Sequence, residues 1–360
     1  MNLIIEKTVK PKPETAEKRI AAYDRLLNQR ENEEKEEADY DYLTLSQFEE
    51  MLKKEWISYF PEHYRDNRVV IKDVGKANRP AERKVGIRRG TGPVLLLPIA
   101  PCYEAVTKGA FAGNILKKMA EEYQQRETEG KHISDKMQTV DICNYETVKD
   151  KVIFTLVNRK ENADYLQDAT YLPFEDLAKV FYIRVDENVR IKVTSPMYSQ
   201  WGVNLEALEK TAKENMQEKL PPLLFNLEAC PFPLENAKNC LAETGSLTGR
   251  LYNLTNAEFY LGAAVMFYPD VMEQITQRMK EPFYILPSSV DDLMLVPKRE
   301  EITLSDVRDL VRIANREAVS PEDFLSDNVY CYDSKTREIR MMHEDFAVEK
   351  PKRREREYER

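Results

Sequence analysis

Three β-hairpin patterns, separated by two amphipathic helix patterns, occupy residues 251–341 and constrain the fold more than any other feature. Apolar residues that alternate with polar ones around short turn sequences are typical of antiparallel hairpins, and apolar residues spaced three and four apart are typical of helices. The segment therefore predicts a compact α+β unit. The expected strand pairs are Leu251–Thr255 with Phe259–Phe267, Phe283–Leu286 with Leu293–Val296, and Val329–Tyr332 with Glu338–Met341.

The helix patterns between these hairpins begin at recognisable residues. Pro269 lies where a first helical turn is expected, and a proline is tolerated there because its missing N–H has no helical partner. Thr303 and Asp306 have the spacing of a capping pair, in which each side chain bonds the backbone of the other residue. The Ser-Pro-Glu-Asp sequence at 320–323 predicts a short last helix on the same grounds.

A second α+β pattern covers residues 44–220. Thr44 and Gln47 form a capping-box pattern ahead of an apolar helical face. Helices are also expected near residues 111–123, 161–166 and 204–219, the first with Phe111, Ile115, Leu116, Met119 and Tyr123 on its inner face. The expected strands are Arg68–Val74, Lys84–Arg89, Val94–Ile99, Val152–Val157 and the hairpin Leu177–Val185 with Val189–Thr194.

These patterns predict an α+β fold with two mixed domains of antiparallel hairpins and amphipathic helices. The domains are expected at residues 44–220 and 250–345, joined by a linker at 221–249 that holds four prolines and two glycines. Residues 1–43 are rich in Glu, Lys and Arg and predict a charged helical or disordered arm, and residues 346–360 form a charged tail.

Composition indicates a soluble cytosolic protein. The net charge is −9, which disfavours sequence-independent binding to phosphate backbones. The chain shows no secretory signal pattern and no apolar run near the length that a membrane-spanning helix needs. The five cysteines are an odd number without a C-x-x-C pair, which is typical of reduced thiols.

Four acidic residues are the candidates for catalysis. Asp291, Asp292, Glu322 and Asp327 belong to two acidic segments, and carboxylates of this kind can hold a divalent ion or share acid–base work. A hydrolase or nuclease-like activity requires that at least two of them meet in a concave pocket. Adjacent residues of an extended segment point to opposite faces, so solvated loop carboxylates are the alternative interpretation.

Metal and cofactor motifs are not found in the sequence. His63, His132 and His343 lie far apart, and neither H-E-x-x-H nor paired Cys/His spacing occurs. No metal ligand and no cofactor is therefore predicted. Ser288 and Ser289 follow a strand without a G-x-S-x-G elbow, and they are expected to shape a turn.

The segment 76–89 reverses the local charge, with six basic residues against one acidic residue. Arginines beside a glycine turn can bind an anion through guanidinium and backbone N–H groups. The Gly-Thr-Gly turn at 90–92 leads into a strand and not a helix, so it does not match a phosphate-binding loop. A basic strand of a hairpin is the alternative. The candidate anion-binding residues are Lys76, Arg83, Lys84, Arg88 and Arg89.

Short phrases in both α+β regions form an ordered set. They include Val74-Gly75-Lys76-Ala77-Asn78, Pro98-Ile99, Tyr103-Glu104, Val152–Asn158, Asn162, Pro173-Phe174-Glu175-Asp176-Leu177-Ala178, Trp201-Gly202, Leu254-Thr255-Asn256, Gly262-Ala263-Ala264, Tyr284–Ser289 and Leu325-Ser326-Asp327. In this combination the chain resembles, over about residues 44–341, an uncharacterised bacterial family known mainly from anaerobic gut species. The resemblance implies domain boundaries but no activity, because that family has no known function.

One position departs from the pattern of that family. After the Pro-Ser-Ser turn the family commonly carries a His-Glu pair, and this chain has Asp291 and Asp292 instead. If that histidine is a ligand or base in relatives, the resemblance implies that this chain lacks it.

The function expected from these observations is a non-catalytic cytosolic binding or regulatory protein that acts through protein–protein contacts. A carboxylate- and metal-dependent hydrolase or nuclease-like enzyme is one alternative. Nucleic-acid or anion binding through residues 76–89 is the other, although the acidic net charge argues against nucleic acid. A protein partner is expected and a membrane is not, and the sequence leaves the oligomeric state open.

Overall fold

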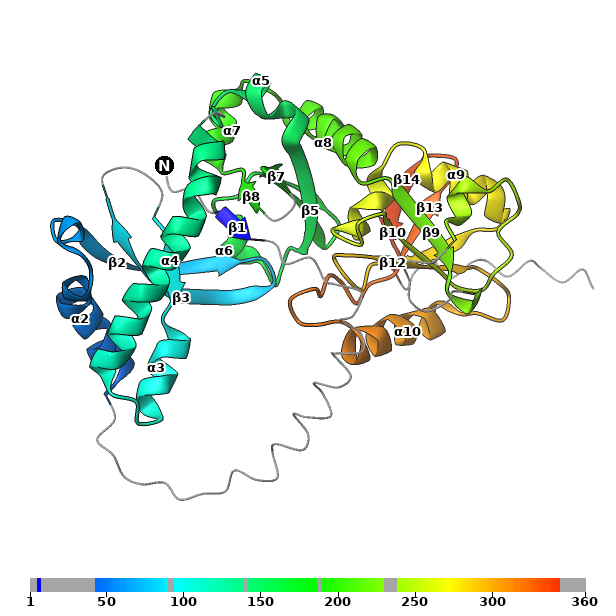
Figure 1. The fold of residues 1–360 in the computed structure, drawn as a ribbon. Helices are drawn as coiled ribbons and strands as arrows, with labels where there is room; N and C mark the ends of the chain where they lie inside the picture. The colour runs from blue at the N-terminus through cyan, green and yellow to red at the C-terminus, as the bar shows by residue number, and fades with distance from the viewer. Residues whose placement is uncertain are drawn as a thin grey trace, which may run out of the picture.

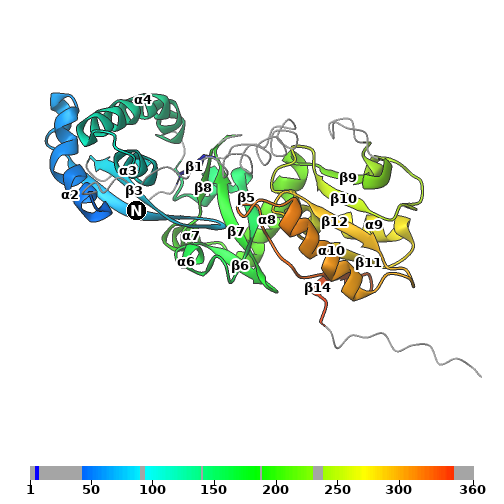
Figure 2. The ribbon, with the colours of Figure 1, turned by 90° about the horizontal axis from the view of Figure 1, so that it is seen from below.

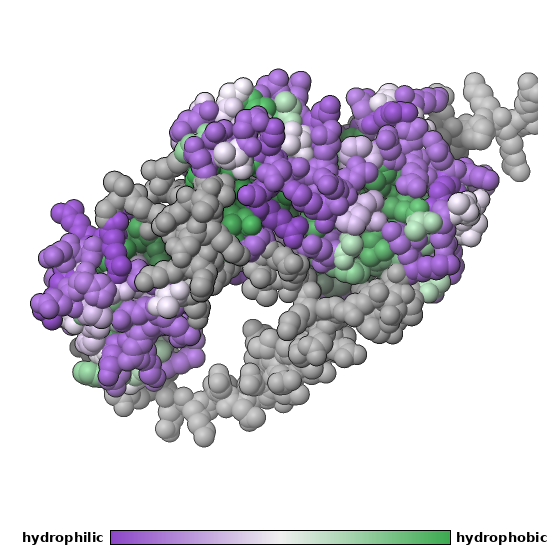
Figure 3. Space-filling model, turned by 45° about the horizontal axis from the view of Figure 1, so that its top comes forward, coloured by the Kyte–Doolittle hydropathy of each residue, from purple (hydrophilic) through white to green (hydrophobic). Residues whose placement is uncertain are grey.

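The computed structural model describes residues 5–7, 43–89, 94–138, 141–186, 189–229 and 238–343, and in them helices cover three antiparallel sheets (Figure 1). The predicted α+β class is confirmed. The sheets lie in a row: a three-stranded sheet, a five-stranded sheet and a six-stranded sheet (Figures 1 and 2). On the face seen in Figure 3 the coloured residues are mostly hydrophilic, with small apolar patches between them.

The three-stranded sheet contains β2 (Arg68–Lys76), β3 (Arg79–Arg88) and β4 (Leu96–Pro98). Helices α2 (Leu45–Glu55), α3 (Ala100–Thr107) and α4 (Ala112–Gln138) cover it around a core that includes Phe48, Trp56 and Tyr123. The predicted Thr44–Gln47 capping box is present and starts α2. Phe111 is 74% exposed, so its predicted place on the inner helix face is wrong; it precedes α4 and lies outside the helical repeat.

The five-stranded sheet is built on one hairpin. Strand β7 (Leu177–Arg184) pairs with β5 (Val152–Asn158), with β6 (Tyr171–Phe174) and with β8 (Val189–Lys192). The predicted 177–194 hairpin is therefore confirmed. Strand β1 (Ile5–Lys7) pairs with the edge of β8. The covering helices are α5 (Tyr145–Val148), α6 (Ala163–Leu166), α7 (Ser195–Trp201) and α8 (Leu205–Lys219), with Asn204 as the N-cap of α8.

The six-stranded sheet has the order β14-β13-β11-β12-β10-β9. Two predicted hairpins, β11 with β12 and β13 with β14, are confirmed. Helix α10 (Leu304–Glu317) packs over a small core of its own, whereas the core of the five-stranded sheet continues into this sheet and α9 (Val271–Met279). The strands are β9 (Pro222–Asn226), β10 (Tyr252–Asn256), β11 (Phe283–Leu286), β12 (Leu293–Pro297), β13 (Tyr330–Asp333) and β14 (Glu338–Met341).

Two further local predictions are wrong. The expected strand Phe259–Phe267 is instead a turn followed by the 3₁₀ helix η7 (Gly262–Phe267), and β10 pairs with β9 and β12. Phe259 and Leu261 have positive φ, which breaks an extended strand. The expected helix at 320–323 is a single turn, in which the Ser320 hydroxyl donates to Asp323 at 2.7 Å.

The segment 221–249, predicted as a linker, contributes β9 to the six-stranded sheet. The amide side chain of Asn239 bonds the open edge of β9, receiving from the Leu224 N–H at 3.1 Å and donating to the Pro222 carbonyl at 3.1 Å. Residues 230–237, most of the predicted arm and the predicted tail lie outside the described residues. Within the described part, no helix is long and apolar enough to span a membrane.

Candidate functional site

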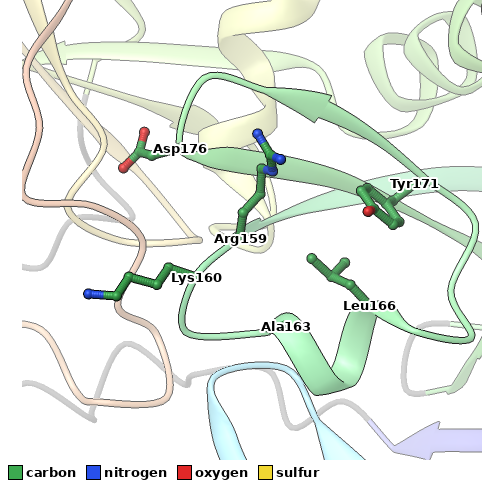
Figure 4. Close-up of a pocket in the computed structure, with 6 residues that line it drawn as sticks. All are labelled: Arg159, Lys160, Ala163, Leu166, Tyr171 and Asp176. Carbon is green, nitrogen blue, oxygen red and sulfur yellow. The ribbon is translucent and has the colours of Figure 1, made fainter.

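A hollow of about 410 Å³ opens where the five-stranded sheet meets its connecting loops (Figure 4). The loop that leaves β5 and the turn between β6 and β7 form its walls, and α6 forms its floor. Six residues line it: Arg159, Lys160, Ala163, Leu166, Tyr171 and Asp176. A concave surface of this kind with a few convergent polar groups is a default candidate for binding.

Hydrogen bonds fix the loop that carries the two basic residues. The Arg159 N–H donates to the Asp176 carbonyl at 2.8 Å, and the Arg159 guanidinium donates to the Glu175 carbonyl at 3.0 Å. The buried Asn158 side chain receives from the Lys160 N–H at 3.0 Å and donates to the Leu325 carbonyl at 3.1 Å. The loop is therefore organised before any ligand arrives.

Of the charged side chains that line the hollow, Asp176 already has hydrogen-bond partners within the protein. Asp176 accepts hydrogen bonds from Ser326 and Asn328 on one carboxylate oxygen and from Tyr330 on the other. Burial, followed by the Asp176 charge, raises the pKa of Tyr330 above its usual range, so Tyr330 keeps its proton and remains a donor. The hydrogen bonds of the Asp176 carboxylate thus join the turn between β6 and β7 to residues 326–330.

Arg159 and Lys160 are exposed and form no ion pair within the described part of the chain. Figure 4 shows the Arg159 guanidinium and the Tyr171 hydroxyl on either side of the hollow above Leu166, while Lys160 extends in the opposite direction. Guanidinium, ammonium and phenol groups all donate hydrogen bonds. The arrangement can therefore hold a carboxylate or phosphate beside an apolar floor, and Asp176 is already engaged.

The four predicted carboxylates are distributed over separate contacts. Glu322 pairs with Arg79 at the surface, and Asp327 accepts from the Asn315 amide at 2.6 Å. Asp291 accepts from the Leu261 N–H at 2.9 Å, and Asp292 accepts from the Asn253 amide at 2.9 Å. Only the adjacent Asp291 and Asp292 share one environment.

The environment of this aspartate pair is crowded with protein atoms. The pKa of Asp291 is raised to about 7, first by burial, against the lowering effect of the Leu261 N–H, and to a smaller extent by the nearby Asp323 and Asp292 charges. Burial also raises the pKa of Asp292, despite the hydrogen bonds from Asn253 and Ser289. The described residues contain no group of three His, Cys, Asp or Glu side chains that could hold a metal ion.

The basic segment 76–89 forms β3 and its turn, and carboxylates accompany much of its charge. Arg83 contacts Glu49 and Asp73, each at 2.8 Å. Lys84 lies 2.9 Å from Glu82, and Arg89 lies 3.3 Å from Glu127. Lys76 and Arg88 are half-buried on the same hairpin. The candidate anion-binding residues therefore lie mostly in ion pairs.

Sequence reasoning missed Arg159, Lys160 and Tyr171. A usable signal was present, because an entirely buried strand, Val152–Asn158, is followed directly by two basic residues. The partner side of the hollow could not be found in this way, since Tyr171 and Asp176 reach it only through the pairing of β6 with β7.

Comparison with known proteins identifies a family and no activity. Neither the curated proteins nor the solved structures contain a match to this chain. The sequence model of the family of unknown function DUF5688 matches residues 45–334, which is most of the chain and nearly the span of the resemblance noted from the sequence. The chain therefore belongs to the family of unknown function DUF5688.

Proposed function

We propose that this protein is a non-catalytic binding or regulatory protein that holds an acidic segment of a partner protein in the hollow beside Tyr171. One observation carries the proposal: Arg159 and Lys160 stand on a preorganised loop at a concave surface, without a carboxylate partner within the described residues. Unpaired cations of this kind select acidic partners and speed their association.

The other lining groups favour a peptide over a bare anion. Leu166 and Tyr171 offer an apolar wall next to the guanidinium, which suits a segment that carries an aspartate or glutamate beside an aliphatic or aromatic side chain. The net charge of −9 would repel a nucleic acid from most of the remaining surface. A cytosolic location, supported by the thiol pattern of the sequence, is part of the proposal.

The test uses a charge-reversed double variant, Arg159→Glu with Lys160→Glu. Labelled peptides that carry Asp or Glu next to Leu or Tyr are titrated at low salt, alongside a single-stranded DNA of equal charge. We expect the tightest peptide to lose about tenfold or more in affinity, since the charge-assisted contact of Arg159 becomes repulsive and the nearby Lys160 charge is reversed as well. The matched control reverses Lys210 and Arg312, which are exposed on α8 and α10.

Three outcomes contradict the proposal. The first is that no acidic peptide binds the wild-type protein even at low salt. The second is that the hollow variant and the control lose affinity equally, which would indicate a general charge effect. The third is that the DNA binds more tightly than every peptide and depends on the same residues, which would favour the nucleic-acid alternative.

A further inference from the structure

Residues 320–326 lie between α10 and β13, and we call them the joint loop. Backbone hydrogen bonds join this loop to the segment that connects β11 and β12. The Val290 N–H donates to the Asp323 carbonyl at 2.9 Å. The Leu325 N–H donates to the Ser288 carbonyl at 3.1 Å, and the Ser326 N–H donates to the Pro287 carbonyl at 3.0 Å. Protection of these three amides from exchange therefore measures whether the joint loop is hydrogen-bonded to residues 287–290.

The joint loop also contacts the other two sheets. At the tip of the β2–β3 hairpin, the Asn78 amide donates to the Phe324 carbonyl at 2.7 Å and to the Glu322 carbonyl at 3.0 Å. At the end of β5, the Asn158 amide reaches the Leu325 carbonyl. The Ser326 hydroxyl donates to Asp176 at 2.7 Å. Figure 2 shows the β2–β3 hairpin extending to the five-stranded sheet. All three sheets therefore meet at one loop.

The charges of three carboxylates act on one another at this contact. Asp291 and Asp292 come from the segment after β11, and Asp323 comes from the joint loop. Asp323 accepts from Ser320 at 2.7 Å. The cation that acts on Asp291 is Arg190 of β8, which also donates to Tyr260 at 3.1 Å. Within the described residues, the charges that act on Asp291 are therefore two carboxylates and one guanidinium.

A buried amide oxygen supplies an independent observation. Asn253 is 7% exposed, and its amide donates to Asp292, but its own side-chain oxygen has no hydrogen-bond partner among the residues that the structure describes. A buried acceptor without a donor costs free energy. A carboxyl group that keeps its proton can donate to such an acceptor, whereas a carboxylate cannot. The Asn253 oxygen is thus best satisfied when Asp292 beside it is protonated.

We propose that the joint loop is a pH-sensitive latch. Protons on Asp291 and Asp292 let the loop close on residues 287–290, and the loss of these protons places negative charges opposite Asp323 and loosens the point where the three sheets meet. The proposal is independent of peptide binding at the hollow.

The direction follows from proton linkage. A carboxyl group whose pKa is raised by folding binds protons more tightly in the folded state. Its contribution to stability is complete below the ordinary pKa near 3.8 and is lost as the pH rises through the folded value, which is about 7 for Asp291. The latch should therefore be closed at pH 5 and loosened at pH 8.

Amide hydrogen exchange of Val290, Leu325 and Ser326, corrected for the intrinsic rate at each pH, tests the latch. In the wild-type protein we expect protection of these amides to fall about tenfold or more between pH 5 and pH 8. In Asp291→Asn with Asp292→Asn, protection should change by less than about threefold, because neither side chain can ionise. The control Asp309→Asn, an exposed position on α10, should behave as wild type.

Equal corrected protection at both pH values in the wild type overturns the latch, and so does an unchanged response in the double variant. If the double variant does not fold, Asp323→Asn decides the matter, because it removes one charge from the opposite side of the contact. A wild-type response in that variant also overturns the latch, and a reduced response supports it.

Discussion

Gly262 shows how one residue positions two distant segments. It is buried at the start of η7, and a Cβ built on it would lie 2.1 Å from the Thr255 hydroxyl oxygen and 2.2 Å from the Asp291 carbonyl oxygen. Real Cβ atoms do not approach so closely, and Asp291 is held on its other side by Leu261. Glycine is therefore required here by space and not by backbone angle.

Gly262→Ala should lower the free energy of unfolding by about 3 kcal/mol, because the added methyl group can only be accommodated by moving backbone. Gly245→Ala is the matched control, since none of the described residues lies within 4 Å of the Cβ it would gain. Urea unfolding of both variants measures the difference. Equal stability of the two variants would show that the backbone around Asp291 can shift to accommodate the methyl group at little cost in free energy.

At the scale of residues, the sequence identified candidate functional residues but not which of them lie close together in the fold. The Asp291–Asp292 pair was identified, and its expected solvation was reasonable because adjacent strand residues diverge. The raised pKa values come first from burial and then from the charge of Asp323, which lies in a separate loop, so no local pattern could predict them. Two basic residues, Arg159 and Lys160, follow a buried strand in the sequence, but only the fold shows that they line a hollow together with Tyr171.

At the scale of elements, the helix starts with a side-chain cap were predicted correctly, whereas the starts expected at Pro269 and at Ser320 were not: α9 begins at Val271, and residues 320–323 form a single turn. Thr44, Asn204 and Thr303 all act as N-caps, because a cap needs only residues within one turn. Hairpins with short loops were also predicted, as β11 with β12 and β13 with β14 show. The strand expected at 259–267 failed because its apolar run is equally suited to a buried 3₁₀ turn, and two residues of positive φ decide between them.

The cap of α10 allows a direct test at this scale. The Thr303 hydroxyl accepts from the Asp306 N–H, and the Asp306 side chain accepts from the Thr303 N–H at 2.9 Å. Thr303→Ala should cost about 1 kcal/mol of unfolding free energy, because it leaves a helical N–H without a partner. Thr303→Ser keeps the hydroxyl and should cost much less. Urea unfolding compares the two, and equal losses would assign the effect to packing of the methyl group.

On the scale of the whole molecule, long-range polar contacts set how the sheets are joined. Asn78 contacts Phe324 across 246 positions of sequence, and Asn158 contacts Leu325 across 167. Each is a single amide side chain, and nothing in the neighbouring sequence indicates its partner. The α+β regions could therefore be predicted from the sequence, whereas the contacts of the joint loop with the three sheets could not.

Asn78 lies at positive φ, so glycine can replace it without backbone strain while removing its side-chain contacts. Asn78→Gly loses the bonds to Phe324 and Glu322 and the contact with Asn162 at 2.7 Å. We expect the coupling between the three-stranded unit and the remainder to weaken by about 2 kcal/mol, at roughly 0.5–1.5 kcal/mol for each bond. The two regions should then unfold in separate steps.

The two tryptophans make this measurable, since Trp56 is buried in the core of the three-stranded sheet and Trp201 in the larger core. Fluorescence of the single-tryptophan proteins Trp201→Phe and Trp56→Phe should follow coincident urea transitions with Asn78 present. With Asn78→Gly, the Trp56 transition should move to lower urea and separate from that of Trp201. Arg337→Gly is the control, because it also replaces a residue of positive φ at a hairpin turn, away from the joint loop. Coincident transitions in Asn78→Gly would mean that apolar packing, and not the amide contacts of the joint loop, holds the three sheets as one cooperative unit.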